Sequence, residues 1–121
     1  MSNKTTEKHF TLFKKHCQKW LDVFGLKGWE PYFLHEPISS SDENVEACVI
    51  YDTKARNVTF YLSTVWNTQI TDKAIIRAAF HEVCELLLGK LNELAKARFA
   101  RESEVEEANH VIIRTLENVL L

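Results

Sequence analysis

The chain has 121 residues, of which 45% are hydrophobic and 26% are charged, and these values are ordinary for one globular domain over residues 1–121 with a single modest core. The formal net charge of −2 gives no broad basic field, so nucleic acid is not an evident partner. The polar N-terminus lacks the apolar core of a signal peptide, and no apolar run approaches the roughly 20 residues that a membrane span needs.

The first predicted element is an amphipathic helix over about residues 5–24, followed by Gly25 and Gly28 as stop signals. Its apolar residues recur at three- and four-residue steps: Phe10, Phe13, Cys17, Trp20, Leu21 and Phe24. The aromatic segment WEPYFLHE at 29–36 predicts a short strand, and Pro31 indicates that it lies at a sheet edge or starts late. The polar segment 38–46 predicts a loop.

Two β-rich runs follow, at residues 47–52 (ACVIYD) and 57–63 (NVTFYLS). The residues between them are few enough for a hairpin connection. In the second run apolar residues alternate with Thr59 and Tyr61, as a strand with one buried face requires. We expect both runs to belong to one antiparallel sheet.

Two helices complete the predicted fold. The first is capped by Thr71 or Asp72 and runs to about residue 89 or 91. The last helix spans about 103–120, with its apolar residues on one side. The order of elements predicts an α+β domain, in which a small antiparallel sheet of about three strands packs with an N-terminal helix, a central helix that carries the active site, and a C-terminal helix.

The cysteines are odd in number and widely spaced, at Cys17, Cys48 and Cys84. They form no C-x-x-C pair, so the sequence indicates neither a disulfide framework nor a cysteine-rich zinc site. We therefore expect the protein to reside in the reducing cytoplasm.

The central helix contains the segment AAFHEVCELLLG, and at 100° per residue its apolar side chains cover most of the circumference. Such a helix is expected to be nearly surrounded by protein. His81, Glu82 and Glu85 are the exception, and three ionisable groups there are costly unless they face water, a partner or an ion. His81 and Glu85 are four residues apart, so they lie on one face and can share a metal. The alternative is a solvated face with ion pairs to Lys90 or Arg77.

Two ligands on one helix need a third from elsewhere to form a catalytic zinc site, and the last helix offers Glu106 and His110. His110 would complete a set of two histidines and one carboxylate. Glu106 would give one histidine and two carboxylates, a set that holds zinc less well against magnesium or manganese. We prefer His110 as the ligand, with Glu106 as its partner or substitute. Alternatively, Glu106 belongs to an S-x-x-E capping box at 103–106, and His110 is a surface residue.

The order of hairpin, H-E-x-x-E helix and closing helix EEANHVIIRTLEN resembles the minimal zincin metallopeptidases, in particular short, often phage- or prophage-encoded zinc peptidases with a gluzincin-like layout. The resemblance covers about residues 47–120. It implies that His81 is the first metal ligand, Glu82 the general base and residue 85 the second ligand, with a third ligand within 102–110. Glu85 departs from the family pattern, which has a histidine at this position.

The resemblance also implies that NVTFYLS is an edge strand, which pairs with an extended peptide substrate through the segment containing Thr59 and Tyr61. The expected function is therefore a metal-dependent hydrolase, most of all a zinc peptidase, with zinc or another divalent metal and a peptide or protein substrate. The alternative is an inactive zincin-like scaffold that binds a protein as a phage accessory factor, with Tyr32, Tyr61 and Trp66 as anchors.

Overall fold

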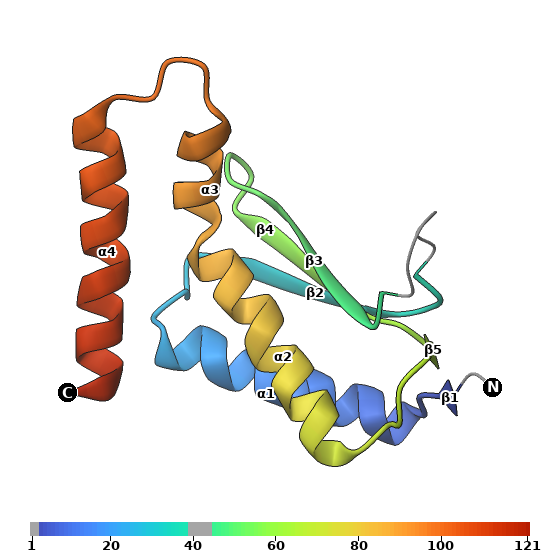
Figure 1. The fold of residues 1–121 in the computed structure, drawn as a ribbon. Helices are drawn as coiled ribbons and strands as arrows, with labels where there is room; N and C mark the ends of the chain where they lie inside the picture. Colours follow the sequence, from blue (N-terminus) through green and yellow to red (C-terminus); the bar gives the residue numbers. More distant parts are fainter. Residues whose placement is uncertain (1–2, 39–44) are drawn as a thin grey trace.

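A computed structural model describes residues 3–38 and 45–121 of the chain. Within these residues the chain forms five strands and four helices (Figure 1). Their bounds in chain order are β1 Asn3–Lys4, α1 Glu7–Val23, β2 Glu30–His35, β3 Ala47–Asp52, β4 Asn57–Leu62, β5 Val65–Trp66, α2 Asp72–Leu87, α3 Gly89–Lys96 and α4 Glu102–Leu120. Most of the loop predicted at 38–46 lies outside the described residues.

The main sheet has three strands in the order β2, β4, β3. β4 is antiparallel to its hairpin partner β3 and parallel to β2. The prediction of an antiparallel sheet is therefore wrong for one of the two pairs, because β2 does not pair with the next strand along the chain. A second sheet, which the sequence pattern did not predict, joins β1 to β5. The coarser prediction of an α+β domain with a small sheet is confirmed.

The predicted hairpin between β3 and β4 is confirmed, and local hydrogen bonds close it. Oδ1 of Asp52 accepts hydrogen bonds from the backbone N–H groups of Lys54 and Ala55, at 2.9 and 3.1 Å. Asp side chains favour turns because they bond their own backbone in this way. The hairpin fixes β3 as one edge strand of the main sheet and β4 as its centre.

The core lies between α1, α2 and β4, and α1 packs directly on α2. Its fully buried side chains include Phe13 and Cys17 from α1, Val58, Phe60 and Leu62 from β4, and Ile75, Ala79 and Val83 from α2. Burial of each large apolar side chain contributes about 1.5–3 kcal/mol. The alternation in β4 is thus confirmed, and it turns Thr59 and Tyr61 toward the opposite face of the sheet.

The N-terminal helix is confirmed with the bounds 7–23. The hydroxyl of Thr6 caps it by accepting a hydrogen bond from the backbone N–H of His9 at 3.3 Å. Gly25 follows the helix with a φ of +70°, a left-handed conformation that favours glycine and ends helices.

The predicted central helix is two helices, because the chain bends at Leu88 between α2 and α3. Thr71 caps α2 as predicted, since its hydroxyl accepts a hydrogen bond from the backbone N–H of Ala74 at 3.1 Å. At the bend, a Cβ on Gly89 would lie 3.0 Å from ring atoms of Tyr51. The glycine therefore permits a close approach of β3 to the end of α2.

The last helix, α4, packs beside α3 and stands at one side of the molecule (Figure 1). Its first turn is capped by Glu104, whose Oε1 accepts a hydrogen bond from the backbone N–H of Arg101 at 3.1 Å. The capping box expected from Ser103 and Glu106 is therefore wrong, because the helix begins earlier than this motif requires.

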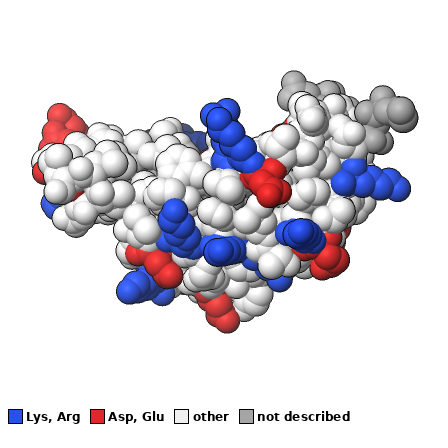
Figure 2. Space-filling view, turned by 90° about the horizontal axis from the view of Figure 1, so that it is seen from below, with Lys and Arg blue, Asp and Glu red and all other residues white. Residues whose placement is uncertain are grey.

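Figure 2 shows the molecule from below, where basic and acidic side chains are interspersed on the surface. Among the helices in the described parts of the chain, none is both long enough and apolar enough to cross a membrane.

Candidate metal centre

Three ionisable residues near the C-terminal half of α2 lie together, as the sequence predicts. His81, Glu82 and Glu85 each offer one ligand atom, and these atoms lie within 4.8 Å of one another. Nε2 of His81 is 3.9 Å from Oε1 of Glu85. Two ligands at about 2.0–2.1 Å from one zinc ion are at most about 4 Å apart. The prediction of a cluster that could bind a metal is therefore confirmed, although its geometry does not identify the metal as zinc.

The three residues differ in exposure. The side chains of His81 and Glu85 are 69% and 52% exposed, whereas Glu82 is 5% exposed. The prediction that α2 is nearly surrounded by protein is wrong, since Phe80 and Leu88 are also exposed by more than a third. The reason is that α4 packs beside α3 and leaves this part of α2 open to solvent.

Glu82 is buried with an unsatisfied carboxyl oxygen. Its Oε1 has no hydrogen-bond partner among the described residues. Burial raises the pKa of this carboxyl to about 8, with a further contribution from the hydrogen bond and charge of Glu85, so the carboxyl holds a proton at neutral pH. A cation next to Glu82 would replace this proton and stabilise the charged form. The orphaned oxygen beside an imidazole and a second carboxylate thus fits a metal site.

Two cysteines, one on α1 and one on β3, lie close enough to Glu82 to be affected by its charge. Burial raises the pKa of the Cys17 and Cys48 thiols, and the charge of Glu82 raises both further. These thiols therefore stay protonated at neutral pH and are poor ligands and nucleophiles. The metal-binding potential of the site rests on the histidine and the two glutamates.

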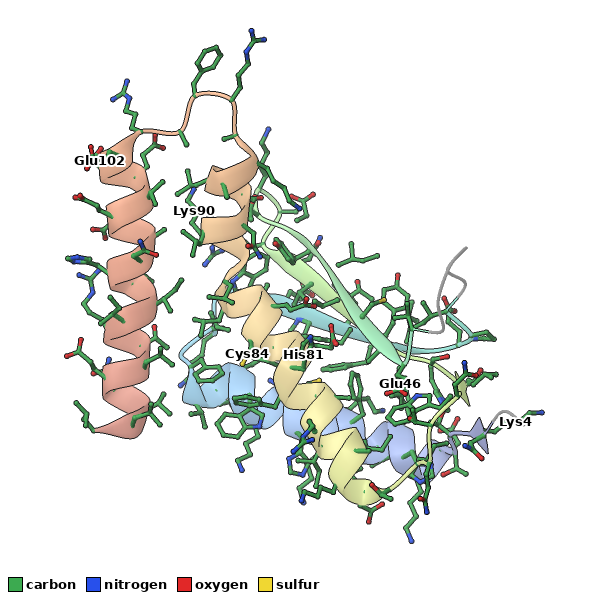
Figure 3. The ribbon with its side chains drawn as sticks, in the orientation of Figure 1. Lys4, Glu46, His81, Cys84, Lys90 and Glu102 are labelled. Atoms are coloured by element: carbon green, nitrogen blue, oxygen red, sulfur yellow. The ribbon has the colours of Figure 1, made fainter. Side chains whose placement is uncertain are left out.

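A cleft of about 600 Å³ opens beside these residues. One wall is formed by α2 between Thr71 and Glu82, and the other by Glu46 and Ala47 at the start of β3 (Figure 3). Among the residues of α2 that line the cleft, His81 and Glu82 are the nearest to the C-terminus of the helix. This cleft could not be predicted from the sequence, because its second wall comes from a strand whose position the sequence does not reveal.

The structure does not bring Glu106 and His110 to this site. Both side chains are exposed on α4, and this helix stands on the far side of α3 from the labelled His81 (Figure 3). Within residues 3–38 and 45–121, the group of potential ligands consists of the three residues of α2. The physical reason is that α4 packs on α3 and buries Ala108. A third ligand from the last helix thus has no support from this geometry.

The predicted edge position of the substrate strand is wrong. Thr59 and Tyr61 belong to β4, which has β2 on one side and β3 on the other. Both edges of β4 are therefore already hydrogen-bonded and cannot accept a peptide. The alternating pattern reveals which side chains are buried but not which strands are neighbours. The edge strands are β2, as Pro31 indicated, and β3, which borders the cleft.

No family model matches this sequence, and comparisons with curated proteins and with solved structures give no match either. The resemblance to zincin metallopeptidases therefore stays a prediction. The case for a function depends on the geometry of the site.

Proposed function

We propose that this protein is a metal-dependent hydrolase that acts on peptide bonds. His81 and Glu85 would hold the cation, and Glu82 would act on the attacking water. The main support is the buried Oε1 of Glu82, which has no hydrogen-bond partner in the described chain although it borders an open cleft. Leaving a buried polar atom unpaired costs about 1–3 kcal/mol, and a neighbouring cation with its bound water would offset that cost.

The candidate ligands suit a divalent cation that binds both nitrogen and oxygen atoms. His81 offers a ring nitrogen, and Glu85 offers a carboxyl oxygen; zinc accepts both kinds of ligand. With Glu82 ionised, one histidine and two carboxylates give no net charge around a dication, so manganese or magnesium can compete with zinc. When bound, such an ion lowers the pKa of its water and polarises a carbonyl group.

Glu82 is placed to serve as the general base. A general base works best when its pKa lies near the operating pH. Burial sets the pKa of Glu82 at about 8, and a nearby cation would lower it from there. In its ionised form, Glu82 would accept a proton from the attacking water and return it to the leaving amine.

The peptide substrate and a phage or prophage origin belong to this proposal through the resemblance to zincins. The proposal of a cytoplasmic location is supported by the cysteines, which are free in the described residues. These parts of the proposal are independent of the metal site and could fail separately from it.

Metal analysis of protein purified without chelators tests the core of the proposal. We expect about one divalent cation per chain, because His81 and Glu85 lie close enough to share a single ion. His81→Ala should lose the metal, and Glu82→Gln should abolish peptide cleavage while the fold is retained. A wild-type protein that contains no metal, and gains none on dialysis against zinc or manganese, would contradict the proposal.

A second candidate function, a protein-binding scaffold, is favoured by the exposed face of the main sheet. Tyr32, Leu34 and Ile50 are 49%, 41% and 61% exposed there. Trp66, expected as an anchor, is only 1% exposed and cannot contact a partner. A biological activity that survives Glu82→Gln would favour the scaffold over the hydrolase.

A further inference from the structure

Two basic residues line the cleft on the approach to His81. Lys73, Arg77 and His81 follow one another at four-residue steps along α2, so they share one face of the helix, and all three border the cleft. Within residues 3–38 and 45–121 neither Lys73 nor Arg77 forms an ion pair, since the pairs found there are His81 with Glu85 and Arg114 with Glu107. Two cations thus face the cleft without an acidic partner in the described chain.

The rest of the cleft leaves room for an anionic ligand. Ala74 and Ala78 lie next to the two basic residues and are small enough for a peptide backbone to approach. The cleft also reaches the N-terminal turn of α2, where the helix dipole favours negative charge. Glu46 on the opposite wall accepts a hydrogen bond from the hydroxyl of Thr68. This hydrogen bond holds the Glu46 carboxylate toward Thr68, although it leaves the negative charge of that wall in place.

The spacing of these residues matches an extended peptide. A helix rises 1.5 Å per residue, so Arg77 and Lys73 are about 6 and 12 Å from His81 along the axis. An extended chain advances about 3.3 Å per residue, so a carboxylate about two residues from a bond held at His81 would reach Arg77. The wall opposite α2 is the start of β3, and an edge strand can pair with such a peptide.

We infer that the cleft selects acidic peptides, because Arg77 and Lys73 bind a carboxylate of the ligand. The position of that carboxylate relative to the cleaved bond rests on the proposed hydrolase function, whereas carboxylate binding itself does not. The group is the side chain of an acidic residue or the C-terminus of the peptide, since both offer the same chemistry to an arginine and a lysine.

Binding to the metal-free protein tests this inference without any need for catalysis. The probes are dye-labelled alanine peptides: one with a glutamate, one with glutamine instead, both amidated at the C-terminus, and a third with glutamine and a free C-terminus. Fluorescence anisotropy at low salt should show that the neutral peptide binds about 3- to 10-fold more weakly than at least one of the others. Whichever charged peptide binds better identifies the source of the carboxylate.

Variants of the two basic residues test whether the preference for the charged peptides arises in the cleft. Arg77→Gln and Lys73→Gln should each reduce it, and the double variant should abolish it. Lys27→Gln makes the same change of charge at an exposed residue between α1 and β2, outside the cleft, and should leave the preference unchanged. Equal affinities for the three peptides in the wild type, including no measurable binding of any, would overturn the inference. So would a preference that persists in a correctly folded double variant.

The same measurements separate this inference from the proposed function. Metal-free protein that prefers the charged peptides, but never binds metal, would refute the hydrolase and support carboxylate recognition. A metal-dependent hydrolase that binds and cleaves the three peptides equally well would refute carboxylate recognition and support the hydrolase.

Discussion

Glu82 and His81 are adjacent in the sequence, yet the first is 5% exposed and the side chain of the second is 69% exposed. Successive helix residues point about 100° apart, and Glu82 shares the buried stripe of Ile75, Ala79 and Leu86. An apolar residue would fit this stripe at lower cost, since a buried unpaired carboxyl destabilises the fold. A carboxyl group that is buried and also borders a cleft is typical of functional sites, where the surroundings shift the pKa of the group.

The raised pKa of Glu82 predicts how the metal-free protein responds to pH. The pKa of this carboxyl is 4.5 without the influence of the fold and about 8 in the folded chain. Below pH 4.5 this carboxyl holds its proton in both the folded and the unfolded chain. Its burial therefore causes no pH-dependent loss of stability there. Between these values only the folded chain keeps the proton, and stability falls as pH rises until the loss is complete above pH 8. The total loss is on the order of a few kcal/mol.

Urea denaturation at several pH values, with a chelator present, measures this effect. Glu82→Gln should remove the decline, and the difference between the wild type and the variant isolates Glu82 from other titrating groups. Glu106→Gln, at an exposed position of α4, should keep the wild-type slope. If the wild type and Glu82→Gln respond to pH in the same way, Glu82 has an ordinary pKa and is not held as the structure indicates.

Among the elements, α2 shows both what the sequence can predict and what it cannot. Its amphipathic period, its cap at Thr71 and the i, i+4 spacing of His81 and Glu85 are local properties, and the structure has each of them. The parallel pairing of β2 with β4, the edge position of β3 and the packing of α4 beside α3 depend on contacts between distant segments. For this reason the cluster of candidate ligands on α2 could be predicted, whereas the second cleft wall and the absence of His110 from the site could not.

Because α2 carries the whole site, its N-terminal cap should matter for the site as well as for stability. The Thr71 hydroxyl satisfies one of the backbone N–H groups that have no partner within the helix. Thr71→Ala should lower the free energy of unfolding by about 1 kcal/mol. Thr71→Ser keeps the hydroxyl and should remain close to the wild type in denaturant titrations. Equal losses in the two variants would show that the methyl group of Thr71, and not its hydroxyl, stabilises α2.

At the scale of the molecule, α4 stands beside α3 (Figure 1), and the side chains of His81 and Glu85 on α2 remain exposed. The ligands that the structure groups together then all come from a single helix. Such a site does not need a long-range contact to bring its ligands together, and water or substrate must complete the coordination of the ion. The position of α4 therefore decides between an open candidate centre, in which His81 and Glu85 are the protein ligands, and a closed one that includes His110.

Thermal unfolding with and without zinc distinguishes these two arrangements. A ligand at 100 times its dissociation constant stabilises the native state by about 2.7 kcal/mol, which corresponds to a rise in Tm on the order of 10 °C. For an open centre, His81→Ala should lose this rise, whereas His110→Ala and Glu106→Gln should retain it, because both residues lie on α4 away from the ligands of α2. Loss of the rise in His110→Ala would mean instead that α4 moves over α2 when metal binds, and that the last helix supplies the third ligand.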